Sequence, residues 1–273
     1  MIHVGILGAN GRMGQSLIQM IPHIEGLCLS HAIVRDTHES LGNPVGLKNP
    51  TEMRYTHEKE EAFQNADVMV EFMLPEATVD NVSKAKRFHT PLVIGTTGLG
   101  EKEKQALSEA AKLIPIVYDT NMSFGIAMLN QLVEQVAHRL QSLDVDFDCE
   151  IHEKHHKYKK DIPSGTAITL GQHVARGRGV DLEKRGSLRS AEKQFHSLQT
   201  VHQRQPGEIG FSAQRGGGIF GDHDVSFVSD EEMLTLSHRA LNRSVFAKGA
   251  LIAAKWVVSQ KPGLYTMADV LGL

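Results

Sequence analysis

The sequence predicts an α/β protein, in which a doubly wound parallel sheet is joined to a second α+β domain with an open mixed sheet. Three observations predict this. Short apolar runs alternate with amphipathic stretches before residue 120, a glycine-rich segment follows the first run, and a later run at 144–153 alternates strictly between apolar and polar residues. Parallel strands are apolar on both faces because helices cover both, whereas a strand with one covered face alternates.

The apolar runs predict five strands in the first part of the chain, at residues 2–7, 27–34, 66–73, 91–97 and 114–118. Later patterns predict a long helix around 129–140, strands at 144–153, 208–214, 222–228 and 233–237, and a closing helix at 245–258. Residues 177–204 are polar and weakly patterned, which indicates a long connection. We therefore expect one domain formed by residues 1–121 and 234–273, and a second formed by residues 122–233.

Composition excludes several classes of protein. The chain has 273 residues, 41% hydrophobic and 22% charged, which is ordinary for a soluble globular protein. A net charge of -3 gives no bulk attraction to nucleic acid or anionic membranes. The two cysteines are too few for a disulfide framework. No signal-peptide pattern opens the sequence and no apolar run could span a bilayer, so we expect a cytoplasmic protein.

The glycine-rich segment contains the first candidate binding residues: Gly8, Ala9, Asn10, Gly11, Arg12 and Met13. It lies between a strand and a helix, with Asn10 where the usual dinucleotide fingerprint has its second glycine. Small residues let the backbone approach a pyrophosphate, whose charge is met by free N–H groups at the helix start. A tight turn without a ligand is the alternative, but the position in a βαβ pattern favours a Rossmann-type dinucleotide-binding domain.

The end of the second strand should select between NADH and NADPH. A ribose-binding carboxylate is usual there, but this chain has Val34 followed by Arg35. An arginine can bind the 2′-phosphate of NADPH, which favours that cofactor. Asp36 would serve NADH if the register moved by one or two residues, so NADPH and/or NADH stay open.

Two further groups end the fourth and fifth strands and are expected to contact the cofactor: Gly95, Thr96 and Thr97, then Asp119, Thr120, Asn121 and Met122. Open α/β sheets bind ligands beyond the carboxyl ends of their strands. A plain strand-ending turn is the alternative for the first group, and a hinge between the domains is the alternative for the second.

Residues 152–156 match H-E-x-x-H, the zinc protease pattern. That motif works on a helix, where its two histidines share a face. The period-2 alternation that runs up to this segment makes His152 part of a strand, so we expect no metal site.

The same segment suits proton transfer to an anionic substrate. Four protonatable side chains fall within six residues: His155, His156, Lys159 and Lys160. Ser164 is a good N-cap, and the amides of Gly165 and Thr166 would then point at an anion. This combination suits a carboxylate substrate that needs a proton. A solvated basic loop beside an ordinary helix cap is the alternative.

With these residues, HHKYKKDIPSGT at 155–166, the chain resembles the dihydrodipicolinate reductases. The glycine-rich segment, residues 95–97, the stretch from Arg215 to His223 and residues 263–271 also look like that family, so the resemblance covers essentially the whole chain. Two departures concern the cofactor. Val34 replaces an acidic residue found in many members, and Asp119-Thr120 replaces small residues before Asn121.

The resemblance implies an enzyme that reduces 4-hydroxy-tetrahydrodipicolinate to tetrahydrodipicolinate by hydride transfer from NAD(P)H, in lysine and diaminopimelate biosynthesis. It implies Lys159 as the proton donor and His155 as its acid/base partner, with His156, Gly165 and Thr166 on the substrate carboxylates. It also implies a homotetramer built through the second domain's sheet. A sugar or amino-acid dehydrogenase of the same plan and a non-catalytic nucleotide-sensing regulator are the rival hypotheses. The sequence assigns no role to the loop at 215–218.

Overall fold

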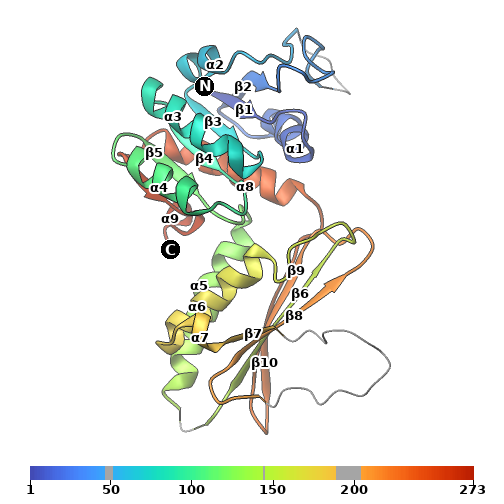
Figure 1. Ribbon diagram of the computed structural model, residues 1–273, viewed down its shortest axis with the longest axis vertical. Helices are drawn as coiled ribbons and strands as arrows, with labels where there is room; N and C mark the ends of the chain where they lie inside the picture. The colour runs from blue at the N-terminus through green and yellow to red at the C-terminus, as the bar shows by residue number, and fades with distance from the viewer. Residues whose placement is uncertain (47–51, 144, 189–203) are drawn as a thin grey trace. The chain divides into compact units, whose positions relative to one another are not determined.

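The chain divides into two compact units in the computed structural model, which describes residues 1–46, 52–143, 145–188 and 204–273 (Figure 1). Unit 1 comprises Met1–Phe124 and Asn242–Leu273, and unit 2 comprises Gly125–Leu241. Residue 144, where we expected a strand to begin, and residues 189–203 of the expected long connection lie outside the described residues. No described helix combines the length and the apolar character needed to span a bilayer.

Unit 1 is built on a six-stranded sheet with the spatial order β11-β5-β4-β3-β1-β2. Its strands are β1 (Ile2–Leu7), β2 (Leu27–Ile33), β3 (Val68–Glu71), β4 (Leu92–Ile94), β5 (Pro115–Tyr118) and β11 (Gly263–Tyr265). All neighbouring pairs are parallel. Every residue of β3 and β4 is buried because the sheet is covered on both faces. The predicted doubly wound parallel sheet is confirmed.

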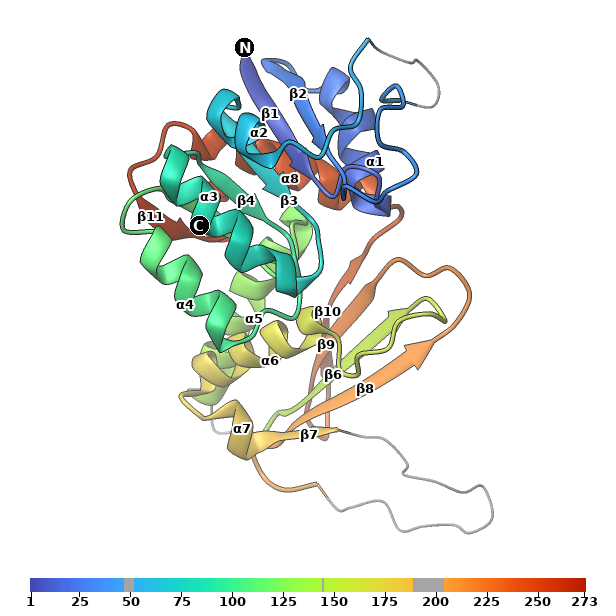
Figure 2. The ribbon, with the colours of Figure 1, turned by 45° about the horizontal axis from the view of Figure 1, so that its top comes forward.

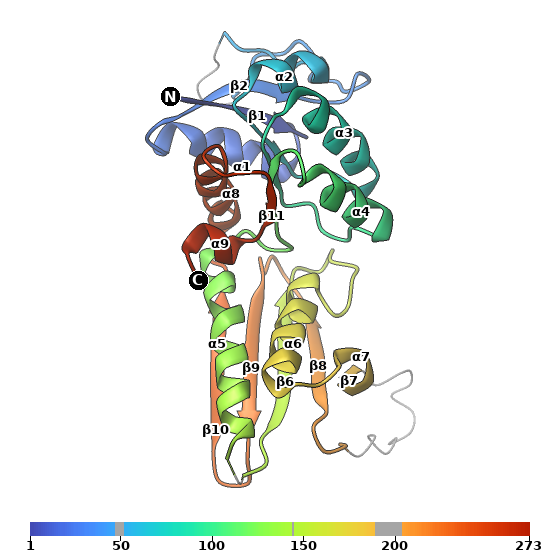
Figure 3. The same cartoon turned by 90° about the vertical axis from the view of Figure 1, so that its left-hand side faces the viewer.

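Helices cover both faces of this sheet (Figures 2 and 3). On one face α1 (Arg12–Met20) packs on α8 (Ser244–Val257), which also contacts β3 and β4. On the other face lie α2 (Lys59–Asn65), α3 (Thr78–Phe88) and α4 (Glu101–Ala110). The 3-10 helices η1 (Ile21–His23) and η2 (Pro75–Ala77) and the short helix α9 (Met267–Leu271) complete the unit.

The topology of unit 1 places its ligand-binding edge. Strand β1 pairs with β2 on one side and with β3 on the other. The strand order therefore reverses at β1, and in such sheets ligands bind outside the carboxyl ends of the strands at the reversal. The residues that follow β1, β2, β3, β4 and β5 meet at this edge.

Unit 2 contains a five-stranded mixed sheet with the order β10-β9-β6-β8-β7. Its strands are β6 (Asp148–His155), β7 (Gly186–Leu188), β8 (Ile209–Arg215), β9 (Asp222–Val228) and β10 (Met233–Arg239). Strand β6 pairs in parallel with β8 and antiparallel with β9. Its helices are α5 (Phe124–Gln141), α6 (Gly165–Arg178) and α7 (Leu182–Arg185). The expected open mixed sheet is confirmed.

The core of unit 2 lies between its sheet and two of its helices, α5 and α6, which share one face of the sheet (Figure 3). Cys149 and Ile151 on β6 pack with Val133 of α5 and Leu170 of α6. Alternate residues of β6 are buried, which is the period-2 pattern visible in the sequence. No described helix covers the opposite face of the sheet (Figure 1).

The unit boundaries differ from those we expected at residues 121/122 and 233/234. Strand β10 pairs with β9 along its whole length, from Met233 opposite Val228 to Arg239 opposite Asp222. The chain therefore returns to unit 1 only at Asn242. The short polar run that separates β9 from β10 is a hairpin turn within one sheet.

Candidate active site

The glycine-rich segment of unit 1 is shaped by two glycines. Gly8 has φ +76°, a left-handed conformation that favours glycine. A Cβ on Gly14 would lie 2.4 Å from the carbonyl oxygen of Gly8, so only glycine lets α1 start this close to the strand. Gly11 is the N-cap of α1 and supplies no side-chain cap, which leaves the first helical amides available to an anion.

Asn10 ties this segment to the chain that follows β2. Its side-chain amide donates to the hydroxyl of Ser40 at 2.7 Å. Gln15, one turn into α1, donates to the hydroxyl of Tyr55 at 2.6 Å and to the carbonyl of Ala9 at 3.1 Å. The side chain of Asn10 thus holds the loop shape, which explains how a non-glycine residue is accommodated there.

The residues after β2 present a cation. Val34 is buried, and the side chain of Arg35 is exposed. No ion pair joins Arg35 to any residue that the structure describes. The carboxylate of Asp36 accepts the backbone amide of Thr37 at 2.9 Å. Arg35 is therefore available to bind a phosphate, while the carboxylate of Asp36 is hydrogen-bonded to the backbone of the turn in which it lies.

The turn after β4 is held from inside by a buried carboxylate. Thr96 donates from its hydroxyl to Glu71 at 3.2 Å, and Glu71 also accepts from Thr78 at 2.6 Å and Asn81 at 2.9 Å. Burial raises the pKa of Glu71 against the effect of these hydrogen bonds. The Thr96 hydroxyl is thus used within the protein, whereas Thr97 is exposed. An acidic residue inside an otherwise apolar strand was the signal for Glu71.

The loop after β5 is anchored to the C-terminal segment. Asp119 accepts the backbone amides of Met267, the first residue of α9, at 3.1 Å and of Asn121 at 3.3 Å. Burial raises the pKa of Asp119, although these backbone hydrogen bonds lower it. Asn121 in turn accepts the amide of Ser123 at 2.9 Å. A Cβ on Gly249 of α8 would lie 1.7 Å from the carbonyl oxygen of Met122, so α8 touches this loop directly.

In unit 2 the histidine-rich segment begins as a strand. His152 lies within β6, and its ring nitrogen Nδ1 is 2.8 Å from the hydroxyl of Ser212 on β8. Glu153 is the next residue and therefore points to the opposite face of the sheet. The three side chains of the H-E-x-x-H pattern do not share a helical face, so the zinc interpretation lacks its geometry.

His155 ends β6 and is held by a buried carboxylate. Its Nδ1 is 2.5 Å from Glu153, which is fully buried. Arg215 at the end of β8 donates both terminal nitrogens to Glu153, at 2.8 and 2.6 Å. Burial alone would raise the pKa of Glu153, but the hydrogen bonds and charges of His155 and Arg215 lower it to about 2.

A second buried histidine stands beside the first. The ring of His223 is 5.2 Å from that of His155 at an angle of 75°, and its Nε2 is 3.1 Å from the hydroxyl of Ser164. Burial, followed by the charge of His155, lowers the pKa of His223 to about 3. Ser164 also caps α6, because its hydroxyl accepts the amide of Ala167 at 3.2 Å. The N-terminus of α6 is therefore fixed next to His155.

The predicted proton donor lies on the connecting loop. The amine of Lys159 is 2.8 Å from the carboxylate of Asp161, and the Lys159 side chain is 22% exposed. Arg215 donates to the carbonyl of Asp161 at 2.7 Å, which links this loop to the Glu153 carboxylate. The structure thus brings His155 and the loop that carries Lys159 to one end of the sheet. Gly165 is the first residue of α6, and a Cβ added to it would meet no atom within 4 Å.

The glycine-rich turn at 216–218 continues the sheet. The amide of Gly216 donates to the carbonyl of His155 at 2.9 Å, and Lys157 donates to the carbonyl of Gly217 at 3.3 Å. The backbone beyond β8 therefore runs alongside the histidine-rich segment, which gives this loop the structural role that the sequence left open.

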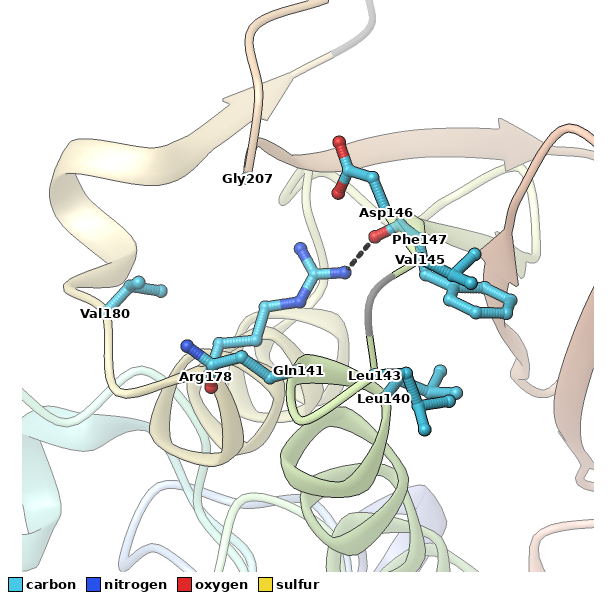
Figure 4. Close-up of a pocket in the computed structure, with 9 residues that line it drawn as sticks. All are labelled: Leu140, Gln141, Leu143, Val145, Asp146, Phe147, Arg178, Val180 and Gly207. Carbon is cyan, nitrogen blue, oxygen red and sulfur yellow. Dashed lines mark hydrogen bonds between the residues drawn. The ribbon is translucent and has the colours of Figure 1, made fainter.

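A pocket of about 530 Å³ elsewhere in unit 2 contains none of the predicted site residues (Figure 4). It lies where α5 and α6 end, and Arg178 reaches across it to donate to the carbonyl of Phe147 at 2.5 Å. The guanidinium thus holds the start of the sheet to α6. The residues predicted to carry the chemistry in unit 2 lie at the other end of β6.

Comparisons with known proteins cover both units. Residues 2–122 match the family model of the dihydrodipicolinate reductase N-terminus, and residues 125–271 match that of its C-terminus. Proteins of a Sulfurovum species and a Nitratiruptor species, both called 4-hydroxy-tetrahydrodipicolinate reductase, are 43% and 42% identical to this chain over 100% of both lengths. A dipicolinate-bound dihydrodipicolinate reductase from a Paenisporosarcina species shares the fold, with a TM-score of 0.75, 21% identity and 98% coverage of each chain.

Proposed function

This chain belongs to the dihydrodipicolinate reductase family, and from that membership we propose how its residues carry out the family's reaction. It is an NAD(P)H-dependent oxidoreductase that reduces 4-hydroxy-tetrahydrodipicolinate to tetrahydrodipicolinate in lysine and diaminopimelate biosynthesis. The observation that carries the assignment of roles is the pairing of His155 with buried Glu153 at the end of β6.

Unit 1 is the dinucleotide-binding domain in this proposal. NADH or NADPH supplies the hydride when bound. The amides at the start of α1 bind the pyrophosphate, because Gly8 and Gly14 let the backbone come close to it. Arg35 binds the 2′-phosphate of NADPH. The turns that follow β4 and β5 hold the nicotinamide half of the cofactor. The side chains of Thr96 and Asp119 are already hydrogen-bonded within the protein, so these two residues contact the cofactor through their backbone groups.

Unit 2 binds the substrate, a small cyclic dicarboxylate. The amides of Gly165 and Thr166 at the start of α6 bind one carboxylate, and the space around Gly165 leaves room for it. His156 binds the second carboxylate from the loop that leaves β6. An α6 N-terminus held by Ser164 supplies fixed dipoles, which cost no reorganisation when the substrate arrives.

Proton transfer falls to two residues. The 4-hydroxyl group leaves the substrate as water, and the unsaturated carbon that results accepts the hydride. Hydride addition builds negative charge on the conjugated nitrogen system, so a proton must be delivered. Lys159 delivers it from its amine, which lies 2.8 Å from the carboxylate of Asp161 on a partly exposed side chain. His155 is the acid/base partner and exchanges protons through Nε2, since Nδ1 faces Glu153.

The second domain's sheet is also the proposed surface for assembly into a homotetramer. The face opposite α5 and α6 carries no described helix, and β10 exposes Met233 on that face, because its neighbour Leu234 lies opposite Phe227 on the core face. Apolar side chains on a sheet surface favour association with another copy. Light scattering after size exclusion checks the tetramer, and Met233→Lys should yield smaller species. The setting proposed for the enzyme is the cytoplasm.

An assay with freshly generated substrate tests the function. The upstream aldol enzyme supplies the cyclic imine, and NADH and NADPH are offered in parallel while their absorbance is followed. We expect cofactor oxidation only when the imine is present, with preference for NADPH. A sugar and an amino acid serve as control substrates. Oxidation with either control, or none with the imine, would reject the function.

A further inference from the structure

The Glu153 carboxylate receives hydrogen bonds from donors on every side. His155, Arg215 and the backbone amide of Ser164 all point at it, with both terminal nitrogens of the arginine taking part. The residue is fully buried, and its side chain is 1% exposed. A buried carboxylate with such a complete set of donors is rigid, because any rotation breaks charge-assisted hydrogen bonds.

We propose that Glu153 and Arg215 form a positioning pair that fixes the ring of His155 with its proton on Nδ1, leaving Nε2 to exchange protons with the substrate. This inference rests on the proposed role of His155 as the acid/base partner. Glu153 and Arg215 touch neither substrate nor cofactor in this scheme, and they act through the histidine.

Hydrogen-bond direction sets the tautomer. An ionised carboxylate only accepts, so the proton between Glu153 and Nδ1 of His155 belongs to the imidazole. Arg215 keeps the carboxylate ionised, and the pKa of about 2 agrees with this. The neutral ring therefore has Nε2 as its free nitrogen. A Cβ on Gly221 would lie 3.1 Å from Nε2, so a glycine there leaves space in front of that atom.

Arg215 connects this pair to the proposed proton donor. Besides Glu153, its guanidinium holds the carbonyl of Asp161, whose carboxylate pairs with Lys159. One side chain thus orients both residues that carry protons. A purely structural ion pair between β6 and β8 is the competing interpretation, and the tautomer of His155 distinguishes the two.

Glu153→Gln is the direct test. All four contacts of Glu153 come from donors, so an amide NH₂ must replace one accepting oxygen. At the Oε2 position it would face His155 and one terminal nitrogen of Arg215; there it would donate to Nδ1, move the ring proton to Nε2 and lose the hydrogen bond from that nitrogen of Arg215. At the Oε1 position the amide NH₂ would face two donors, Arg215 and the backbone amide of Ser164, and would accept from neither. We expect kcat to fall by about 10²–10⁴-fold, the usual contribution of acid–base catalysis, with the KM for NADPH unchanged.

Glu134→Gln is the matched control. Glu134 accepts from His173 at 2.7 Å and from Arg176 at 3.2 Å, so it forms the same combination of side chains on α5 and α6. This variant should keep the kcat of the parent. Glu153→Asp retains the charge and should recover part of the kcat lost in the glutamine variant, provided that circular dichroism shows both to be folded.

Nitrogen NMR of histidine-labelled protein reads the tautomer without any turnover. The parent should show His155 protonated at Nδ1 when neutral, and Glu153→Gln should change that pattern, while Glu134→Gln should not. An Nε2-protonated ring in the parent, or a glutamine variant with normal kcat, would overturn the proposal. If the parent failed to reduce the imine, the proposed function would fall, yet the NMR result would still decide whether Glu153 sets the tautomer.

Discussion

Replacing His223 with glutamine should remove much of the acid sensitivity of unit 2. Burial and the neighbouring charge of His155 lower the pKa of His223 from 6.5 to about 3. The unfolded chain therefore binds a proton that the folded chain does not bind over the range between these values. The contribution of neutral His223 to the free energy of unfolding is fully present above pH 6.5 and is lost as the pH falls toward 3. Glutamine can still reach the hydroxyl of Ser164 but does not titrate.

The magnitude follows from the unfolded state. With an unfolded pKa of 6.5, the imidazole is roughly one-quarter protonated at pH 7 and almost fully protonated at pH 5. Integrating the difference in protons bound by the unfolded and folded states from pH 7 to pH 5 gives the effect of this one group. The parent should lose about 2 kcal/mol of its free energy of unfolding through it. The value requires only that the folded pKa lie well below 5. The variant should lose about 2 kcal/mol less than the parent between the two pH values.

Urea unfolding at pH 7, 6 and 5 measures this difference, with circular dichroism as the signal and a fixed chain concentration. The comparison uses the change with pH, so a lower stability of His223→Gln at every pH does not affect it. His173→Gln is a useful comparison, because burial also lowers the pKa of His173, which pairs with Glu134 and is therefore not in contact with His155. Equal losses for the parent and His223→Gln from pH 7 to pH 5 would refute the assignment of a neutral buried histidine.

Three further predictions concern the proposed roles. Lys159→Ala and His155→Ala should each lower kcat by about 10²–10⁴-fold and leave NADPH binding intact in fluorescence titration; weaker binding at normal kcat would contradict them. Gly249→Ala should push the Met122 carbonyl away, costing about 1–3 kcal/mol in urea unfolding and raising the NADPH Kd in calorimetry, whereas an unchanged Kd would separate α8 from the cofactor loop. Arg35→Ala should raise the KM for NADPH by about 10–100-fold, the value of a charge-assisted hydrogen bond, with little change for NADH. Equal effects on both cofactors would exclude a contact with the 2′-phosphate.

Local patterns predicted most of the fold. Helix and strand periods differ, so the apolar runs of unit 1 and the alternation at β6 indicated their structures directly. The strand β11 and helix α9 were missed, because Gly263–Tyr265 is too short to show a period and pairs with β5, far away in sequence. The expected long connection at 177–204 is wrong in its first part, because that part contains the equally short elements α7 and β7. The expected domain boundary at 233/234 falls at the start of β10 for a similar reason. Only the pairing of β10 with β9 shows that this strand belongs to the sheet of unit 2.

The candidate site separates into local and long-range parts. The helix cap at Ser164 was predictable, since capping depends on neighbouring residues. The clamp of Arg215 on Glu153 was not predictable, because 62 positions separate the two residues and only the pairing of β6 with β8 brings them together. Asp119 was expected to contact the nicotinamide or the hinge. The structure shows that its carboxylate accepts the amide of Met267 at the start of α9, a contact between residues 148 positions apart that local patterns do not indicate.

Glu153 shows how secondary structure decides what a short motif means. On a helix, His152 and His156 would share a face as metal ligands and Glu153 would act as a general base. In strand β6 the alternation turns His152 to one face and directs Glu153 with His155 to the other. The carboxylate then meets an imidazole two residues on and a guanidinium from the next strand, and becomes a fixed acceptor with a pKa of about 2. A carboxylate with such a low pKa is a poor base at neutral pH, but it can hold a histidine in place. In a strand, therefore, the glutamate of this motif positions the ring of His155, whereas on a helix it would serve a metal site.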